Sequence, residues 1–148
     1  MSTTDELYQE VILDHNRQPR HFGELNAPTH QAEGYNPLCG DHYQLALTLG
    51  EDGIITEIGF TGTGCAISKA SLSIMAETLS GKTPQEARDL FEKFHNLVTG
   101  KNTTKTDLGK LTVFSGITRF PTRVKCAILG WHALIGALDE KTKPVSTE

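Results

Sequence analysis

The stretch HYQLALTLGEDGIITEIGF, residues 42–60, decides the fold. Its first half alternates apolar and other residues, which is the period of a half-buried strand. The apolar set that shares a face is Tyr43, Leu45, Leu47 and Leu49. Asp52 and Gly53 then supply a turn signal. The second half alternates again, and its shared face is Ile54, Thr56, Ile58 and Phe60. We therefore predict an antiparallel hairpin with one face in the core.

One helix is predicted on each side of this hairpin. Residues 3–19 have the helical period and end at a proline. Their stripe is Tyr8, Val11, Ile12 and His15. Residues 20–41, rich in His, Pro and Gly, are expected to form a loop. A second helix follows Cys65 and ends at Gly81. Its stripe is Leu72, Met75, Ala76 and Leu79. Cys65 is therefore predicted at a strand-to-helix junction.

Two further helices complete the chain. Thr83 and Glu86 form a predicted capping box, which opens a helix that ends at a glycine. The buried stripe of that helix is Ala87, Leu90, Phe91, Phe94 and Val98. Residues 101–120 are predicted as a loop with a short helical turn, and a last helix follows Pro121. Its core face is Val124, Ala127, Ile128, Trp131, Ile135 and Leu138. The pattern predicts one α+β domain over residues 1–148, a small antiparallel sheet with helices packed on one face.

Composition narrows the class of protein. The chain has 148 residues, is 37% hydrophobic and carries a net charge of -4 without a block of like charges. This balance gives no reason to expect binding to nucleic acid or to an anionic membrane surface. The N-terminal residues are polar and acidic, unlike a signal peptide, and the apolar stretch 127–138 is too short to span a bilayer. We therefore expect a cytoplasmic protein, in which three cysteines favour a metal or catalytic role over a disulfide framework.

The hairpin register brings candidate ligands together. With the turn centred on its Asp-Gly pair, residue n of the first strand faces about residue 104 minus n of the second. Asp41 then faces about Thr63, and Cys39 faces about Cys65. The remaining cysteine, Cys126, lies in the first turns of the last helix, and a helix packed on the sheet can present it at the same place. Three thiolates and one carboxylate are a chemically sensible tetrahedral ligand set for zinc.

The charge of such a site requires compensation. Three thiolates, a carboxylate and a dication sum to a charge of about -2, and Arg123, one turn before Cys126, is expected to offset part of it. The N-terminal ends of the two helices are expected to lower the pKa of Cys65 and of Cys126. Thiolates stabilised in this way are nucleophiles as well as ligands. A labile cysteine in this site can therefore accept sulfur as a persulfide.

Four segments of the chain resemble the SufU/IscU-like family of iron-sulfur cluster assembly proteins. They are ELYQEVILDHNRQPRHFG, NPLCGD, TGTGCAISKASLSIM and FPTRVKCAILGWHAL. The chain looks closer to the SufU branch, because the 61 positions from Cys65 to Cys126 (126 minus 65) fit an insertion typical of that branch, here within about residues 90–110. In addition, FPTRVK stands where the scaffold branch has a Leu-Pro-Pro-Val-Lys chaperone-recognition segment.

The resemblance implies a SufE/IscU-like fold and a specific activity. It implies a tightly bound zinc held by Cys39, Asp41, Cys65 and Cys126, and sulfur relay from a SufS-type cysteine desulfurase. By position, Cys39 is the expected persulfide acceptor. The chain would then be a zinc-dependent sulfurtransferase that works with the downstream iron-sulfur assembly machinery, and the resemblance leaves a homodimer open.

Three other functions stay open on the sequence. One is an IscU-type scaffold that assembles a transient [2Fe-2S] cluster on Cys39, Cys65 and Cys126. Another is a hydrolase that uses Cys39 as nucleophile with His42, although His42 fits better as an exposed residue at the start of a strand. The last is a purely structural zinc domain. Elemental analysis of anaerobically purified protein separates the zinc and iron alternatives.

Overall fold

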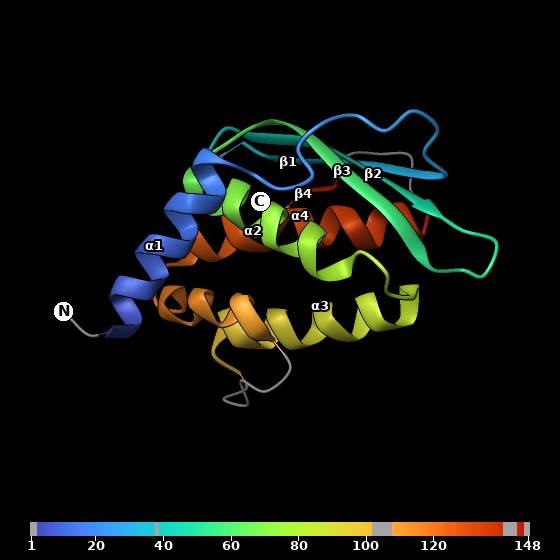
Figure 1. Cartoon of the computed structure of the whole chain (residues 1–148). Helices are drawn as coiled ribbons and strands as arrows, with labels where there is room; N and C mark the ends of the chain where they lie inside the picture. Colours follow the sequence, from blue (N-terminus) through green and yellow to red (C-terminus); the bar gives the residue numbers. More distant parts are fainter. Residues whose placement is uncertain (1–2, 38, 102–107, 141–144, 147–148) are drawn as a thin grey trace.

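Four strands form one sheet in the computed structural model, which describes residues 3–37, 39–101, 108–140 and 145–146 (Figure 1). The strands are β1 (His30–Asn36), β2 (Asp41–Leu49), β3 (Ile55–Thr63) and β4 (Val145–Ser146), in the spatial order β3-β2-β1-β4. The first three are antiparallel neighbours, and β4 pairs with β1 in parallel. The predicted α+β class, with an antiparallel hairpin in its sheet, is confirmed.

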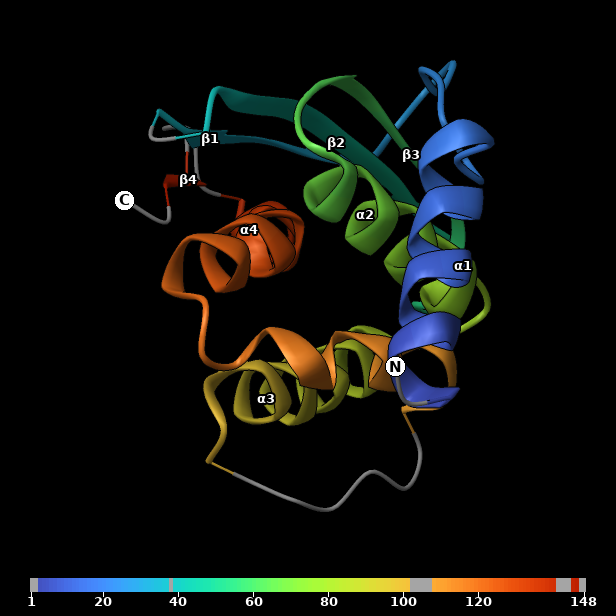
Figure 2. The same ribbon diagram turned by 90° about the vertical axis from the view of Figure 1, so that its left-hand side faces the viewer.

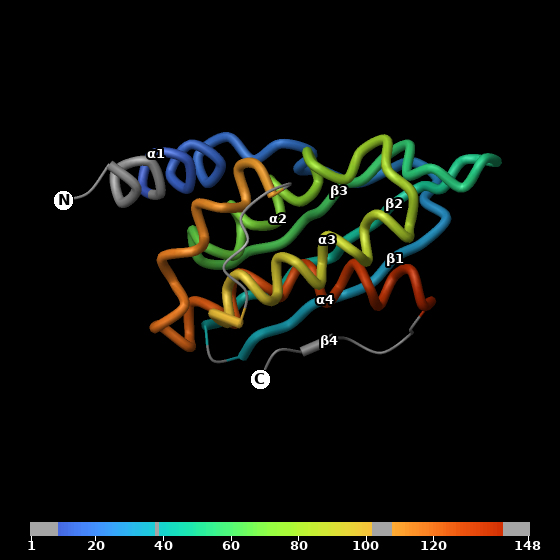
Figure 3. The backbone as a smooth tube through the Cα atoms, turned by 90° about the horizontal axis from the view of Figure 1, so that it is seen from below, coloured from blue at the N-terminus to red at the C-terminus, as the bar shows by residue number. Residues whose placement is uncertain are grey.

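Helices cover one face of the sheet in two layers (Figure 2). The helical segments are α1 (Thr3–Arg17), α2 (Ala66–Leu79), α3 (Pro84–Thr99), the 3-10 helix η1 (Gly109–Ile117) and α4 (Pro121–Leu138). Helix α4 contacts β1 and β2, and α2 contacts β3. Helices α3 and η1 form the layer further from the sheet, and α1 packs against α2 and η1. Viewed from below, α3 lies in front of α4 (Figure 3).

Helix α4 is buried on more than one side because it lies between the sheet and α3. Trp131 is fully buried and stacks on Phe94 of α3, with ring centroids 5.1 Å apart. Leu129 and Leu134 are buried as well, although the predicted single stripe omits them, whereas Ile135 is only partly buried. A helix that is apolar nearly all round is typical of such a central position. Among the described residues, no helix is both long and apolar enough to cross a membrane.

Strand β1 occupies part of the region predicted as a loop. Its sequence HQAEGYN has no β-branched residue and no apolar alternation, so propensity and pattern gave no strand signal. It is a strand because its backbone pairs with β2, from His30 opposite Leu47 to Asn36 opposite Asp41. This pairing brings the end of β1 beside the first residue of β2, where the candidate ligands begin.

The hairpin register differs from the predicted one by one residue. Thr63 pairs with His42, not with Asp41, and the register shifts between Thr48 and Leu49. An irregularity of this kind changes which side chains face the core. Ile55 is consequently buried and Thr56 exposed, so the prediction that Thr56 lies on the core face is wrong.

Residues 101–120 contain more regular structure than predicted. Within this segment, η1 is a nine-residue 3-10 helix that buries Leu111, Phe114 and Ile117, whereas the sequence predicts only a short helical turn. The residues from 102 to 107 lie outside the described part of the chain. The predicted capping box of α3 is confirmed, since Thr83 and Glu86 bond reciprocally.

His15 is a buried imidazole at the contact between α1 and α2. It is 1% exposed, and its Nδ1 lies 2.7 Å from the Ser73 hydroxyl. The same hydroxyl accepts the Arg20 backbone N–H at 2.8 Å. The Ser73 hydroxyl thus bridges the imidazole of α1 and the Arg20 backbone at the contact with α2. Burial lowers the pKa of His15 below its ordinary value of 6.5.

We expect metal-free protein to lose stability as the pH falls below about 7. In that range His15 binds a proton in the unfolded chain but not in the folded chain. The free energy of unfolding therefore falls by at most about 1.4 kcal/mol for each unit by which the pH is lowered. The contribution is present above the unfolded pKa and is lost as the pH falls towards the lower folded pKa. Urea unfolding at a series of pH values measures it, and His15→Asn should flatten the dependence.

The matched control is His95→Asn, because His95 lies on α3 and is only partly buried. This variant should keep the wild-type pH dependence. A His15→Asn protein with an unchanged slope would show that the acid sensitivity originates in other groups.

Candidate metal centre

Three potential ligand atoms converge at one end of the sheet. The atoms of Cys39, Asp41 and Cys126 all lie within 4.8 Å of one another, and the two Sγ atoms are 3.2 Å apart. Cys39 precedes β2 by two residues, Asp41 is the first residue of β2, and Cys126 lies in α4, as predicted. Gly40, between the first two ligands, has a φ of 71°, a left-handed conformation that suits glycine. A turn and a helix far apart in sequence thus bring their side chains together.

Cys65 adjoins this trio without being a member of it. It is the N-cap of α2, at the predicted strand-to-helix junction, and its Sγ accepts the Ser68 backbone N–H at 3.4 Å. Its own backbone N–H donates to Asp41 Oδ1 at 2.9 Å. The Asp41 carboxylate therefore ties the start of β2 to the start of α2. The prediction that Cys65 completes the ligand set stays a prediction.

The pKa values of Cys65 and Cys126 shift in opposite directions. A hydrogen bond with Cys126 lowers the pKa of Cys65 to about 6, against the opposing effect of burial. The same hydrogen bond, together with burial, raises the pKa of Cys126 far above its ordinary value. The prediction of a lowered pKa is thus confirmed for Cys65 and wrong for Cys126. Cys126 is 2% exposed and lies beside Cys65, which ionises first. Burial and the neighbouring thiolate outweigh the lowering of the pKa that the helix N-terminus would cause.

Asp41 supplies the observation that tests whether this site fits a cation. The residue is 0% exposed, and its Oδ2 atom has no hydrogen-bond partner among the described residues. Burial of a carboxylate oxygen without a partner is unfavourable unless a cation or another donor is present. Thiolate sulfur and carboxylate oxygen are both zinc ligands. The donor set and the orphaned oxygen therefore fit a zinc ion.

A close-packed cradle holds Asp41 and the start of α2 in place. A Cβ on Gly64 would lie 2.6 Å from Asp41 Oδ1 and 2.6 Å from Ser68 Oγ, and would also clash with the Tyr43 hydroxyl. Tyr43 and Ser68 are both 2% exposed, and their hydroxyl oxygens are 2.9 Å apart. Only a residue without a side chain fits at position 64. The alternating pattern predicts Tyr43 on the core face but not this supporting role, for which the repeated glycines in TGTG are the available signal.

Asn36 is a second supporting residue that sequence reasoning missed. It is 0% exposed, lies opposite Asp41 in the β1–β2 ladder, and directs its Nδ2 donor to Cys126 Sγ at 3.9 Å. Its position depends on β1, which the sequence did not predict. An amide donor beside a thiol stabilises the thiolate form, as groups around metal ligands commonly do.

Arg123 and His42 make contacts with their immediate neighbours. The Arg123 guanidinium lies 4.5 Å from the centroid of the Phe120 ring, in a cation–π arrangement on the protein surface. Whether it also offsets the charge of the centre stays a prediction. His42 is exposed at the second position of β2, bonds Glu33 and has its ring 5.3 Å from that of Tyr35. These contacts agree with the interpretation of His42 as an exposed strand-end residue.

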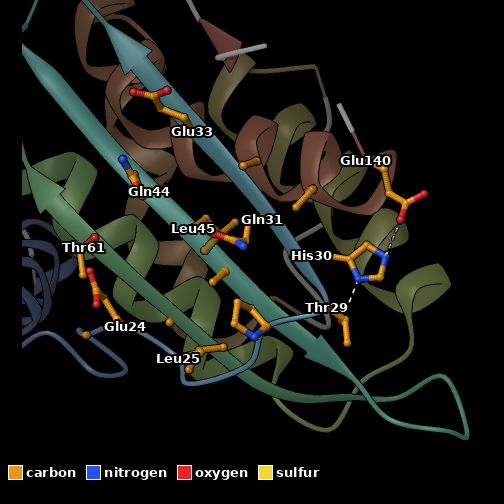
Figure 4. A pocket seen from close by; sticks show the side chains of 16 residues that line it. Glu24, Leu25, Thr29, His30, Gln31, Glu33, Gln44, Leu45, Thr61 and Glu140 are labelled. Carbon is orange, nitrogen blue, oxygen red and sulfur yellow. Dashed lines mark hydrogen bonds and ion pairs between the residues drawn. The ribbon is translucent and has the colours of Figure 1, made fainter. Parts of the chain in front are cut away.

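A separate hollow of about 740 Å³ lies over the sheet (Figure 4). Polar side chains of the strands line it, among them Gln31, Glu33 and Gln44, and the segment that includes Glu24 and Leu25 forms a wall. None of the three cysteines is among its lining residues. The candidate metal centre and this hollow are thus formed by different residues.

The comparisons with known proteins agree with the fold. The model of the NifU-like N terminal domain family matches residues 7–139. The zinc-dependent sulfurtransferase SufU of Bacillus subtilis is 39% identical over 131 residues, 88% of each chain. The iron-sulfur cluster assembly scaffold protein IscU of Streptococcus pyogenes is 37% identical over 139 residues, which cover 93% of this chain and 86% of the relative.

Solved structures share the architecture as well. A candidate iron-sulfur cluster assembly scaffold protein for the SUF system, from Fervidobacterium islandicum, superposes with a TM-score of 0.84 at 34% identity, covering 90% of this chain and 97% of that one. The N-terminal part of a NifU-like protein from Brucella abortus has a TM-score of 0.82 at 22% identity, covering 94% and 96%. The latter likeness concerns the fold alone.

Proposed function

Since this chain belongs to the NifU-like N terminal domain family, we propose that it is an iron-sulfur cluster assembly protein that accepts sulfur from a cysteine desulfurase at a zinc-bound cysteine site. The observation that carries the proposal is the buried Asp41 carboxylate, whose Oδ2 is unpartnered beside the thiols of Cys39 and Cys126. In this proposal Cys39, Asp41, Cys65 and Cys126 hold the zinc. Arg123 supports the charge of the centre, and a SufS-type desulfurase is the partner.

The sulfur transfer is a thiol exchange without net oxidation or reduction. When bound, zinc keeps its cysteine ligands ionised at neutral pH. The Cys39 thiolate attacks the outer sulfur of a persulfide carried by the desulfurase cysteine. One S–S bond forms on Cys39, the S–S bond of the donor breaks, and the donor cysteine leaves as a thiolate. The transferred sulfur keeps its proton and its oxidation state.

Exposure and backbone position support Cys39 as the acceptor. Cys39 is partly exposed and lies outside regular structure, where its backbone N–H donates to the Asn36 carbonyl at 3.3 Å. Cys126 is buried within α4, so a bulky protein donor cannot reach it directly. Cys65 is partly exposed, but Ser68 binds its sulfur at the start of α2. The residue that can reach a donor with least rearrangement is Cys39.

The scaffold function is the second candidate, because the Streptococcus pyogenes relative is named an IscU scaffold at similar identity. On that alternative the three thiols assemble a transient [2Fe-2S] cluster as cargo. Anaerobic purification followed by metal analysis distinguishes the two functions. Colourless protein with stoichiometric zinc supports the sulfurtransferase, and iron with sulfide and visible absorption supports the scaffold.

The direct test is the turnover of a SufS-type desulfurase with and without the protein. Wild-type protein should stimulate turnover, because Cys39 removes the persulfide from the desulfurase. Cys39→Ala should return turnover close to the rate of the desulfurase alone, because no acceptor thiol remains at that position. Alanine production in the presence of a reductant measures the rate.

The matched control is Glu51→Ala, at an exposed position in the turn between β2 and β3, at the other end of the hairpin from the cysteines. It should stimulate as well as wild type. Equal stimulation by Cys39→Ala and wild type would refute Cys39 as the acceptor, and no stimulation by wild type would favour the scaffold or a structural zinc domain.

A further inference from the structure

The two ligand sulfurs of Cys39 and Cys126 are close enough to react with each other. Their Sγ atoms are 3.2 Å apart, and a disulfide requires about 2.05 Å, so a shift of roughly 1 Å brings them to bonding distance. Cys39 can make this shift, because it lies in the connection between β1 and β2 beside Gly40, where a Cβ would meet nothing within 4 Å. Cys126 is held within α4.

Access by an oxidant differs between these two thiols. Cys39 is partly exposed, whereas Cys126 is 2% exposed behind it. A small peroxide molecule therefore reaches Cys39 first, and the sulfur that lies next to the oxidised atom is that of Cys126. An exposed cysteine with a second, adjacent cysteine is the arrangement typical of thiol redox pairs.

We propose that Cys126 is the resolving cysteine for oxidised Cys39, so that a peroxide converts the pair into an intramolecular disulfide. In the first step the Cys39 thiolate attacks one peroxide oxygen, the O–O bond breaks, and Cys39 becomes a sulfenic acid while hydroxide leaves. In the second step the Cys126 sulfur attacks Cys39 Sγ, and the S–O bond breaks. Hydroxide leaves and takes up the proton of the Cys126 thiol as water. Two thiols are oxidised and one peroxide is reduced.

The disulfide has a consequence for the metal centre, and this part rests on the proposed function. Zinc binds thiolate and not disulfide sulfur, so the bond removes two of the three proposed sulfur ligands. Asp41 and Cys65 alone do not make a tetrahedral site. Peroxide should therefore release zinc, and a thiol reductant should restore the capacity to bind it.

Cys65 is the competing partner, because its thiol also forms a hydrogen bond with Cys126. Its sulfur accepts the Ser68 backbone N–H at 3.4 Å, at the fixed first turn of α2. It also lies outside the trio of atoms that are mutually within 4.8 Å. Cys65 should therefore stay outside the intramolecular disulfide, which makes the pairing itself testable.

The test treats reduced, metal-free, full-length protein with a small excess of hydrogen peroxide. The oxidised monomer should keep one titratable thiol of three, and mass spectrometry of non-reduced peptides should join Cys39 to Cys126. Cys65→Ser should form the same disulfide. Cys126→Ser should form none and should accumulate the Cys39 sulfenic acid, which dimedone traps.

The outcomes separate this inference from the proposed function. A bond to Cys65, a dimer linked between chains, or loss of the sulfenic acid in Cys126→Ser at the wild-type rate would each overturn the role of Cys126. The second arm loads wild-type protein with zinc and follows its release by peroxide with a chromophoric chelator. Disulfide formation in a protein that takes up no zinc would contradict the proposed zinc site alone. Release of zinc by peroxide without the disulfide would contradict the resolving role of Cys126.

Discussion

Replacing Gly64 by alanine should weaken zinc binding by about 10- to 100-fold, the usual effect of disturbing groups that orient metal ligands. The added Cβ would lie 2.6 Å from Asp41 Oδ1 and 2.6 Å from Ser68 Oγ, so the carboxylate or the start of α2 must move. Either movement disturbs the Cys65 N–H to Asp41 bond that joins β2 to α2. Competition against a chromophoric chelator measures the zinc affinity.

Gly116→Ala is the matched control for this experiment. Gly116 lies in η1, and a Cβ there meets nothing within 4 Å, so the same chemical change should leave zinc binding unaltered. Circular dichroism of both variants establishes that they are folded. Wild-type zinc affinity in a folded Gly64→Ala protein would contradict the assignment of Asp41 as a ligand.

The parts of the fold that local sequence determines could be predicted. The hairpin, the capping box at Thr83 and the position of Cys65 before α2 all follow from signals within a few residues. Strand β1 could not be predicted, because it depends on pairing with β2 and not on the residues between His30 and Asn36. The register was wrong by one because a local irregularity at Thr48 and Leu49 leaves no distinct sequence signal.

The approximate location of the candidate site was also predictable from the sequence. The approximate register was sufficient to place Cys39 and Asp41 at the same end of the hairpin as Cys65, since a slip of one residue moves a position along its strand by only about 3.3 Å. The direction in which the pKa of Cys126 shifts was not predictable, because it depends on which of two neighbouring thiols ionises first. The role of Asn36 was equally inaccessible, because it acts through a strand with no strand pattern.

The second large effect is expected on the stability of the protein, from changes at the contact between α2 and α4. A Cβ on Gly130 of α4 would lie 2.6 Å from Leu72 Cγ of α2, in a contact where both residues are buried. Gly130→Ala should destabilise the protein by up to about 2 kcal/mol, because overpacking costs about 1–3 kcal/mol and the gain in helix propensity offsets about 1 kcal/mol of that cost. Leu72→Ala alone should cost about 3 kcal/mol through the cavity that it leaves.

The double variant distinguishes steric contact from a general weakening of the core. The alanine at position 130 occupies part of the space that Leu72→Ala vacates, so the double variant should be more stable than the sum of the single changes by about 1 kcal/mol or more. Urea unfolding of metal-free protein measures the three free energies. Leu72→Ala combined with Gly116→Ala provides the additive reference, because position 116 has open space around it.

Additivity of the Gly130 and Leu72 changes within about 0.5 kcal/mol would contradict the close contact between α2 and α4. The crossing also bears on the metal centre, because α2 begins directly after Cys65 and α4 carries Cys126. A shift of one helix against the other alters the distance between these two thiols. Gly130→Ala should therefore weaken zinc binding although it touches no ligand, and Leu72→Ala in the same chain should recover part of the affinity.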